Sequence, residues 1–438
     1  MKVRELFYIG LFSTCLPMSY GVYSDTLEEI VSRTLNSHPE VFASISRVQA
    51  QQQGIDIARA EFFPTIDLST GVGQQKRNMP DNDEQDGKTY TPKESSFSVR
   101  QNLFSGLSSR HNLEEARYKA SSEEQRLISR LQTIALEVAS AYIGVLENRD
   151  MVSLAEGNLQ VHEEIYQQIK KRTEQGVARN SDLSQIVGRR AQAHSSMINA
   201  RNNLSDAESI FQRLVGEMPG DLDQPQGQRL VMPGSLDSAL QTAREDHPGI
   251  IAAMYDIEAA QSSYRSLHSM YYPTLDVEVD QSWDKDADGS LGSHKDLKAM
   301  LVMRYNLFRG GADKSRLEES AFVLEENKAQ QERVIRKVEE TVRQAWASYI
   351  YLTEQQPFLR EHEVSSRESV NAYREQFYIG KRTLLDLLDS ENELFQASRS
   401  LTSALYKETE ARFKILESTG QILNALRLSM DDSFFEED

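Results

Sequence analysis

The sequence predicts a mainly α-helical protein with a small β part, built from two copies of one structural unit. Three observations predict this fold class. The phrase FFPTIDLS at 62–69 returns as YYPTLDVE at 271–278, a spacing of 209 residues. The stretch 106–174 has no proline, and its apolar residues recur three and four apart, which is the spacing of a coiled-coil seam. Four shorter stretches alternate apolar and polar side chains, as β-strands do.

The repeat extends over nearly the whole chain. TLEEIVSRTLNSHPEV at 26–41 aligns without a gap with SLDSALQTAREDHPGI at 235–250, again at a spacing of 209. After the alternating stretches the spacing becomes 204, as between Asn102 and Asn306. The predicted units are a first repeat at 25–216, a linker rich in Pro and Gly at 217–235, a second repeat at 236–428 and an acidic tail at 429–438.

Residues 1–24 are predicted to be a secretory signal peptide. Lys2 and Arg4 give a positive start, and the apolar run at 6–16 that follows is too short for a membrane-spanning helix. Cys15 is the only cysteine in the sequence. Its lipidation is an alternative to simple cleavage after Ser24, although the residues before Cys15 match a lipoprotein signal poorly.

The charge balance and the motifs of the sequence argue against several functions. Acidic residues outnumber basic ones 67 to 49, giving a net charge of −18, so we expect no nucleic-acid partner. HEEIY at 162–166 lacks the second histidine of a zinc-protease helix, and no Walker A sequence occurs. We therefore expect no enzyme activity, no metal and no cofactor. His38 and His247 each precede proline, and their duplication favours a role in turns over a role as metal ligands.

Each copy is predicted to begin with two helices that a His-Pro pair separates. These helices are expected at 26–36, 39–62, 235–246 and 248–271. Pro64 and Pro273 mark the helix-to-strand entries, because proline removes a backbone donor. A long helix, a Gly-containing turn and a return helix complete each copy. A helix over 106–174 would be about 100 Å long, and Pro357 is expected to kink its counterpart.

The four alternating stretches are predicted strands, with one apolar and one polar face. They are expected at about 65–75, 96–104, 274–283 and 297–307. A strand of about ten residues can cross a bilayer when tilted. An open edge in lipid is costly, so four strands need partners from other chains; two chains would give 8 strands and three would give 12. Soluble hairpins that cover a core are the alternative.

The signal peptide, the duplicated HP…(F/Y)PT motifs, the NLF-x-G strand ends and the Gly-bearing turns together resemble the TolC-like outer-membrane efflux family. The resemblance covers the whole mature chain. It implies a homotrimer in the outer membrane of a Gram-negative bacterium, with a 12-stranded transmembrane β-barrel, four strands per chain. A coiled-coil α-helical barrel would extend into the periplasm, with the linker in an equatorial region.

The resemblance also implies a function and partners. The chain is expected to be the exit duct of a tripartite export system, with a periplasmic membrane-fusion (adaptor) protein and an inner-membrane ABC transporter or proton-driven pump. Type I protein secretion is the favoured use, and small-molecule or multidrug efflux is the alternative. A purely structural coiled-coil envelope protein or adhesin is a competing class, which predicts no membrane strands and no pore.

A periplasmic gate is expected at the turns between the long and return helices. Arg382, Asp386 and Asp389 stand at i, i+4 and i+7, so one helical face is predicted to carry all three. Taken alone, this is a solvated helix start. The resemblance implies that the two aspartates form the narrowest constriction. It also implies that Arg382 ties neighbouring coils to the segment Ser181–Asp182.

The turns themselves carry two further expectations. Gly176 and Gly380 are expected to supply the positive φ of tight helix–helix turns. The neighbouring Val177 and Lys381 fall where the family's adaptor hairpins dock. Phe377 stands where the family has a tyrosine of the gate network, which predicts that this contact is missing.

Overall fold

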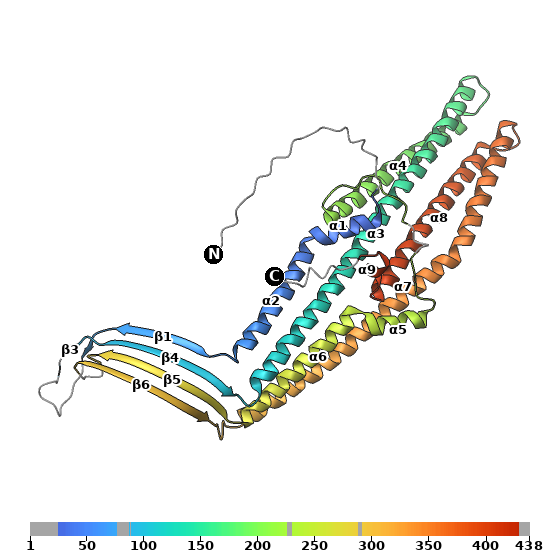
Figure 1. The fold of residues 1–438 in the computed structure, drawn as a ribbon. Helices are drawn as coiled ribbons and strands as arrows, with labels where there is room; N and C mark the ends of the chain where they lie inside the picture. The colour runs from blue at the N-terminus through green and yellow to red at the C-terminus, as the bar shows by residue number, and fades with distance from the viewer. Residues whose placement is uncertain (1–24, 77–86, 88, 226–229, 288–290, 429–438) are drawn as a thin grey trace, which may run out of the picture.

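The computed structural model describes residues 25–76, 87, 89–225, 230–287 and 291–428, so the predicted signal peptide and acidic tail lie outside the described residues. The chain is elongated, with a small sheet at one end and two long helix hairpins at the other (Figure 1). The predicted fold class, mainly helical with a small β part, is confirmed.

The two copies have the same order of elements. The first contains α1 (Leu27–Ser37), α2 (Pro39–Ala60), β1 (Thr65–Val72), β2 (Gln75–Lys76), β3 (Thr89–Tyr90), β4 (Lys93–Phe104), α3 (Ser108–Glu174) and α4 (Asn180–Val215). The second contains α5 (Leu236–Asp246), α6 (Pro248–Leu267), the 3₁₀ turn η2 (His268–Tyr271), β5 (Thr274–Lys285), β6 (Ser293–Arg304), α7 (Ala312–Tyr378) and α8 (Leu384–Ser418), followed by α9 (Ile422–Ala425).

The duplicated His-Pro pairs start the second helix of each copy. Pro39 and Pro248 are the first residues of α2 and α6, where a missing N–H removes no helical hydrogen bond. The Nδ1 atom of His38 accepts a hydrogen bond from the N–H of Glu40 at 3.2 Å. His247 caps α6 in the same way, through the N–H of Gly249 at 3.1 Å. Both histidines are therefore helix N-caps.

The long helices are α3 and α7, with 67 residues each, which corresponds to about 100 Å. Each packs against its return helix, α4 or α8, as an antiparallel hairpin. Pro357 lies inside α7, which continues beyond it to Tyr378. Among the described residues, we find no helix with both the length and the apolar character that a membrane crossing requires.

Two of the predicted strand boundaries are wrong. The first strand ends at Val72, and Gln75–Lys76 pairs instead with Thr89–Tyr90 in a separate two-stranded ribbon. The last strand covers Ser293–Arg304 and stops before residue 307. A strand continues only where its backbone pairs with a neighbouring strand, and residues 305–308 have no such strand beside them in the described part of the chain. β4 and β5 are each a little longer than predicted.

The four main strands form one antiparallel sheet in the order β1-β4-β5-β6. Within each copy the hairpin has the same register, with Thr65 opposite Arg100 and Thr274 opposite Arg304. The central pairing, β4 with β5, joins the first copy to the second. The outer edges of β1 and β6 have no strand partner among the described residues.

Buried apolar residues form three clusters rather than one core. The largest lies at the middle of the molecule and joins α1, α2, α3, α8, α9 and the end of α4. A second lies near the hairpin turns and joins α3, α4, α7 and α8. The third belongs to the second copy and joins α5, α6 and α7. The sheet contributes to none of them, so its apolar face is not covered by a core of this chain.

Candidate functional site

The apolar face of the sheet is exposed on the outer strands β1 and β6 and partly exposed on the central strands β4 and β5. The register places apolar residues opposite one another, such as Ile66 with Val99 and Val277 with Leu301. All eight residues of β1 are exposed, and Leu68 reaches 74%. The sheet extends away from the helices (Figure 1), so this face has no helix over it. Exposed apolar surface of this extent is typical of a membrane or protein contact.

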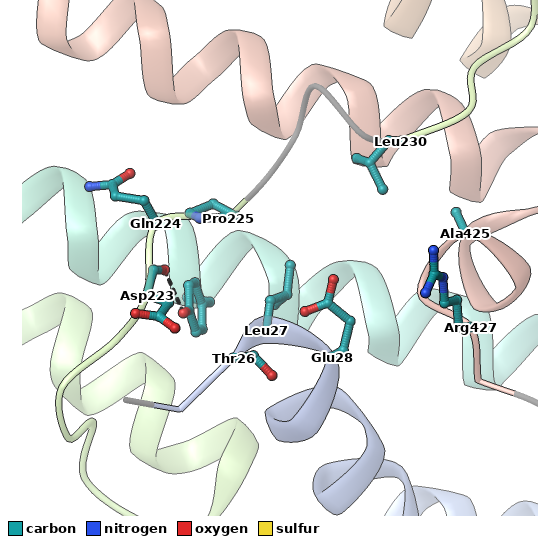
Figure 2. A pocket seen from close by; sticks show the side chains of 10 residues that line it. Thr26, Leu27, Glu28, Asp223, Gln224, Pro225, Leu230, Ala425 and Arg427 are labelled. Carbon is teal, nitrogen blue, oxygen red and sulfur yellow. Dashed lines mark hydrogen bonds between the residues drawn. The ribbon is translucent and has the colours of Figure 1, made fainter. Parts of the chain in front are cut away.

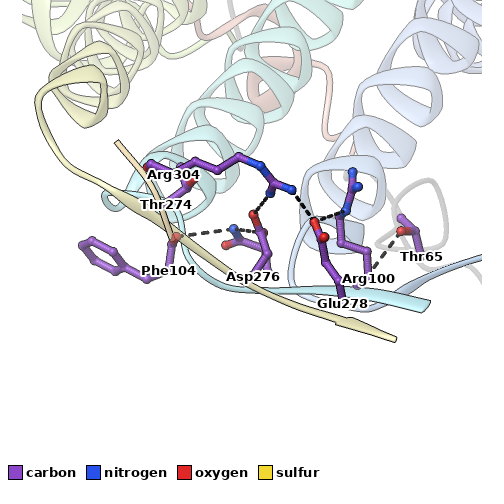
Figure 3. Close-up of polar contacts among 8 residues, drawn as sticks. Thr65, Arg100, Phe104, Thr274, Asp276, Glu278 and Arg304 are labelled. Atoms are coloured by element: carbon purple, nitrogen blue, oxygen red, sulfur yellow. Dashed lines mark hydrogen bonds and ion pairs between the residues drawn. The ribbon is translucent and has the colours of Figure 1, made fainter. Parts of the chain in front are cut away.

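The opposite face of the sheet carries a network of charges at the end nearest the helices (Figure 3). The guanidinium of Arg304 donates to Asp276 at 2.8 Å and to Glu278 at 2.5 Å. Arg100 lies 3.1 Å from the same Glu278 carboxylate, and the Asn102 amide donates to Asp276 at 2.9 Å. The network therefore joins β4, β5 and β6 across the boundary between the copies.

The second hairpin turn contains the predicted gate residues. Gly380 has the expected positive φ, 76°, and α8 starts at Leu384 with Thr383 as its N-cap. The Asp386 carboxylate accepts hydrogen bonds from the Thr383 hydroxyl at 2.8 Å and from its N–H at 3.1 Å. These bonds from Thr383, helped by the nearby Arg382 charge, hold the pKa of Asp386 below its usual value. Asp386 is thus a charged capping residue.

Arg382 does not share a helical face with the two aspartates, so that prediction is wrong. Because Thr383 is the N-cap of α8, Arg382 lies before the helix, in the turn. Its Nε donates to the Gln376 side chain at 3.1 Å, and its guanidinium lies 4.2 Å from the centre of the Tyr373 ring. Within the described residues of this single chain, Arg382 contacts its own helix α7 and not the segment Ser181–Asp182.

Asp389 connects the two hairpins. Its carboxylate accepts a hydrogen bond from Arg189 of α4 at 2.6 Å. The Arg189 side chain is partly buried, at 29% exposed, whereas that of Asp389 is more open, at 56%. Sequence reasoning missed Arg189, because the two residues lie 200 positions apart and no local pattern links them.

The first hairpin turn has the same backbone with a simpler environment. Gly176 has a φ of 75°, close to that of Gly380. The N-cap of α4 is Arg179, whose side chain makes no capping hydrogen bond. The Ser181 hydroxyl lies 3.4 Å from the Asp182 carboxylate, so the hydrogen bond between them is weak. Val177 is exposed, as is Lys381 at the equivalent place in the second turn.

An apolar cluster lies directly behind the turns. Phe377 is buried in it, and the Arg172 guanidinium lies 5.7 Å from the centre of its ring. The neighbouring Tyr378 is exposed, so its hydroxyl does not take the place of the missing one at Phe377. The other buried members are Ile165, Ile169, Ile186, Leu384, Leu387 and Leu388.

A cavity of about 300 Å³ lies in the middle of the molecule, between the start of α1, the segment that follows α4, and α9 with the adjoining Arg427 (Figure 2). At its wall the Tyr142 hydroxyl lies 2.6 Å from the carbonyl oxygen of Asp223 and 2.9 Å from that of Asp25. Burial is the main cause that raises the pKa of Tyr142. The tyrosine therefore acts as a neutral donor that fixes the linker and the N-terminal segment to α3.

Comparison with known sequences gives a match over both copies. The sequence model described as "Outer membrane efflux protein" matches residues 30–217 and, a second time, residues 239–421. These two matches cover most of the chain and coincide with the two copies of the fold.

Individual proteins are similar along most of their length. The outer membrane efflux protein BepC of Brucella suis biovar 1 is 23% identical over 413 residues, which cover 94% of this chain and 89% of BepC. The alkaline protease secretion protein AprF of Pseudomonas aeruginosa is 24% identical over 396 residues, covering 85% and 79%. The solved Campylobacter jejuni CmeC outer membrane channel has a TM-score of 0.81 at 13% identity, covering 93% of this chain and 87% of CmeC.

Proposed function

The chain belongs to the outer membrane efflux protein family, and from this premise we propose that three copies of it form one exit duct of a tripartite export system. Membership makes it an outer membrane efflux channel that extends into the periplasm of a Gram-negative bacterium. The trimer, the partners and the gate are the parts that we propose.

The observation that carries the proposal is a sheet with an exposed apolar face and two edges that have no strand partner among the residues that the structure describes. In a bilayer each unpaired backbone group costs several kcal/mol, so the edges must meet other strands. Three chains with four main strands each would close a barrel of 12, which has room for a lumen. The polar network of Arg304 would then face that lumen.

The narrowest point of the duct is proposed at the second hairpin turn. Around a threefold axis, Asp386 and Asp389 would contribute six carboxylates, and grouped carboxylates attract cations. In the single chain Asp386 is half-buried, with its pKa held below the usual value, and the side chain of Asp389 is 56% exposed. Arg382, Ser181 and Asp182 are proposed to complete the closed state through contacts between neighbouring chains. The exposed turns around Gly176, Val177, Gly380 and Lys381 are the proposed docking sites for the adaptor.

Conductance in planar bilayers tests the duct and the gate together. The purified protein should form a pore that divalent cations block, and the D386N/D389N double variant should lose that block. A matched control, E393Q/E410Q, removes two exposed carboxylates from α8 away from the turn and should keep it. Absence of any pore would contradict the duct, and unchanged block in the double variant would exclude these aspartates from the gate.

Within this role we propose type I protein secretion, with an inner-membrane ABC transporter and a periplasmic membrane-fusion protein. It is supported by AprF, which is named for the secretion of an alkaline protease. Small-molecule efflux is the second candidate, supported by the name of BepC. Deletion of the gene separates them: secretion predicts the loss of a protein from the culture medium, whereas efflux predicts increased susceptibility to drugs and detergents.

A further inference from the structure

The end of the sheet that lies farthest from the helices has an ordered set of charges. Figure 1 shows that this end points away from the helix hairpins. Three strands have a lysine next to an acid there: Lys93-Glu94 in β4, Asp284-Lys285 in β5 and Lys295-Asp296 in β6. Successive side chains of a strand point to opposite faces, so each lysine and its neighbouring acid lie on opposite faces of the sheet.

The strand registers place the three lysines on one face. Lys93 lies directly opposite Lys285. Lys295 lies opposite Trp283, which shares a face with Lys285 because it is two residues away in β5. Phe97 lies four residues along β4 from Lys93, so this is the apolar face of the sheet. Lys93, Lys285 and Lys295 are called the lysine cluster below.

The lysine cluster marks the outer limit of the apolar band. The next side chains on the same face, towards the helices, include Leu68 and Leu297, which are 74% and 68% exposed. From Leu297 to Met303 the band spans about 20 Å, close to the height of the lipid-facing band of outer-membrane barrels. Trp283 lies at its limit, beside the lysines, where an indole suits the boundary between lipid and water.

The charges of the lysine cluster are not balanced within the described residues. All three lysines are exposed, and none forms an ion pair there. Every acidic residue of the four main strands lies on the other face of the sheet. Like charges directly opposite one another destabilise a sheet, as Lys93 and Lys285 do here. An ordinary solvated surface mixes both signs, so this arrangement favours an anion from outside the chain.

We propose that the lysine cluster binds the phosphate groups of the phosphorylated glycolipid that forms the outer leaflet of the outer membrane. The inference rests on the proposed function, because it needs the apolar face of the sheet to lie in lipid. Since the helices extend into the periplasm, the far end of the sheet lies at the outer surface of the membrane. The lysine cluster then lies at the level where acyl chains end and headgroups begin.

Two adjoining surfaces favour a lipid over free phosphate. The lysine ammonium groups supply charge-assisted hydrogen bonds to phosphate oxygens. Directly beneath them, the exposed side chains of Leu68 and Leu297 supply an apolar surface for acyl chains. Free phosphate would use only the first surface, whereas a phosphorylated lipid uses both. A bound phosphate also relieves the repulsion between Lys93 and Lys285.

Titration with lipid A tests the site, with binding to the purified full chain in detergent followed by native mass spectrometry. A basic side chain beside an anionic lipid surface contributes about a factor of five to binding, so K93Q/K285Q/K295Q should weaken it by about 100-fold. K298Q/K328Q/K337Q is the matched control and should bind as the unaltered chain does. It removes three exposed lysines as well, one from the opposite face of the sheet and two from α7. Equal weakening in both variants would overturn the lysine cluster as the site.

Two further ligands identify what is recognised. Lipid A without its phosphates and inorganic pyrophosphate should each bind much more weakly than phosphorylated lipid A. Equally tight binding of the lipid without phosphates would overturn the role of the lysines. Equally tight binding of pyrophosphate would overturn the lipid as the occupant.

Conductance in bilayers without lipid A separates this inference from the proposed duct. K93Q/K285Q/K295Q should still form pores, which shows that it folds and assembles. Pores combined with undiminished lipid A binding would overturn the inference alone, whereas no pore from the unaltered chain would overturn the duct. If the triple variant failed to assemble, K93Q and K285Q would each carry the test, with an expected loss of about fivefold. Unchanged binding in both single variants would overturn the inference.

Discussion

At the end of the first helix hairpin the chain turns through Gly176, and at the end of the second it turns through Gly380, 204 residues later. The two glycines have φ values of 75° and 76°, and in both turns the next N–H bonds back to the carbonyl five residues earlier. The backbone is therefore the same, and it follows from glycine at one position in each copy.

The side chains around the two turns differ at three of four equivalent positions, and only the aspartate three residues after the N-cap is kept. Equivalent residues are Thr173 and Phe377, Arg179 and Thr383, Asp182 and Asp386, and Gln185 and Asp389. The second turn thus has a buried aromatic ring, an N-cap whose side chain makes a capping hydrogen bond, and an acid that binds the other hairpin. At the equivalent places the first turn has Thr173, Arg179 without a capping bond, and Gln185. Duplication preserved the shape, while substitution placed the anchoring contacts in one copy only.

Removal of the ring should give the largest change. F377A would leave a cavity in the apolar cluster behind the turn, and we expect the free energy of local opening there to fall by about 3–5 kcal/mol. Amide hydrogen exchange of residues 384–388 measures this opening. T173A, at the equivalent place, removes a half-exposed hydroxyl and should change exchange at the first turn little. If F377A and T173A lowered the free energy of local opening equally at their own turns, the buried ring would not be what distinguishes the two turns.

The N-cap should give the next largest change. T383A removes the hydroxyl that bonds the Asp386 N–H, and should lower the stability of the start of α8 by about 1 kcal/mol. T383S retains the hydroxyl and serves as the control. The reverse change, R179T, should stabilise the start of α4, because Asp182 is already placed to complete the same capping box. Hydrogen exchange at residues 180–186 would reveal the gain, and no gain would show that the backbone there differs.

The sequence was sufficient to predict the repeats, the hairpins and the two faces of the sheet, because each depends on local periodicity. It did not predict the end of β6 at Arg304, because the continuation of a strand depends on a partner that the described part of this chain does not supply. The start of α8 was misjudged for a different reason. The spacing of Arg382, Asp386 and Asp389 was interpreted as one helical face. Thr383 and Asp386 instead form a capping box, so the helix begins after Thr383 and does not include Arg382.

The connection of Asp389 to Arg189 had no signal in the sequence, since contacts between distant helices depend on tertiary packing. The charged network of the sheet, by contrast, did have a signal in the sequence. Arg100 and Arg304 are equivalent residues at a spacing of 204, and two arginines repeated within alternating strands indicate a shared role.

Loss of the pair between the hairpins should have a smaller effect. Asp389 is more than half exposed, so R189Q should weaken the connection by about 0.2–1 kcal/mol. In bilayers we expect the closed state to leak more, because the second hairpin is less firmly held. R190Q is the matched control: its arginine lies next in sequence but pairs with Glu163 within its own hairpin. Equal leak currents from the two variants would show that the loss of a positive charge, and not the loss of the pair with Asp389, causes the leak.

The smallest expected effect is a dependence on pH at the second turn. The hydrogen bonds from Thr383 hold the pKa of Asp386 below its unfolded value of about 3.9. Ionised Asp386 therefore stabilises the turn fully above that pH, and the contribution is lost as the pH falls through the lowered pKa. Hydrogen exchange at residues 383–387 should accordingly gain a component of opening only below about pH 4. The D386N variant should lack that component, and T383A should show it reduced, because the hydroxyl that lowers the pKa is gone. An unchanged acid response in both variants would assign the effect to another carboxylate and leave the second turn no more sensitive to acid than the first.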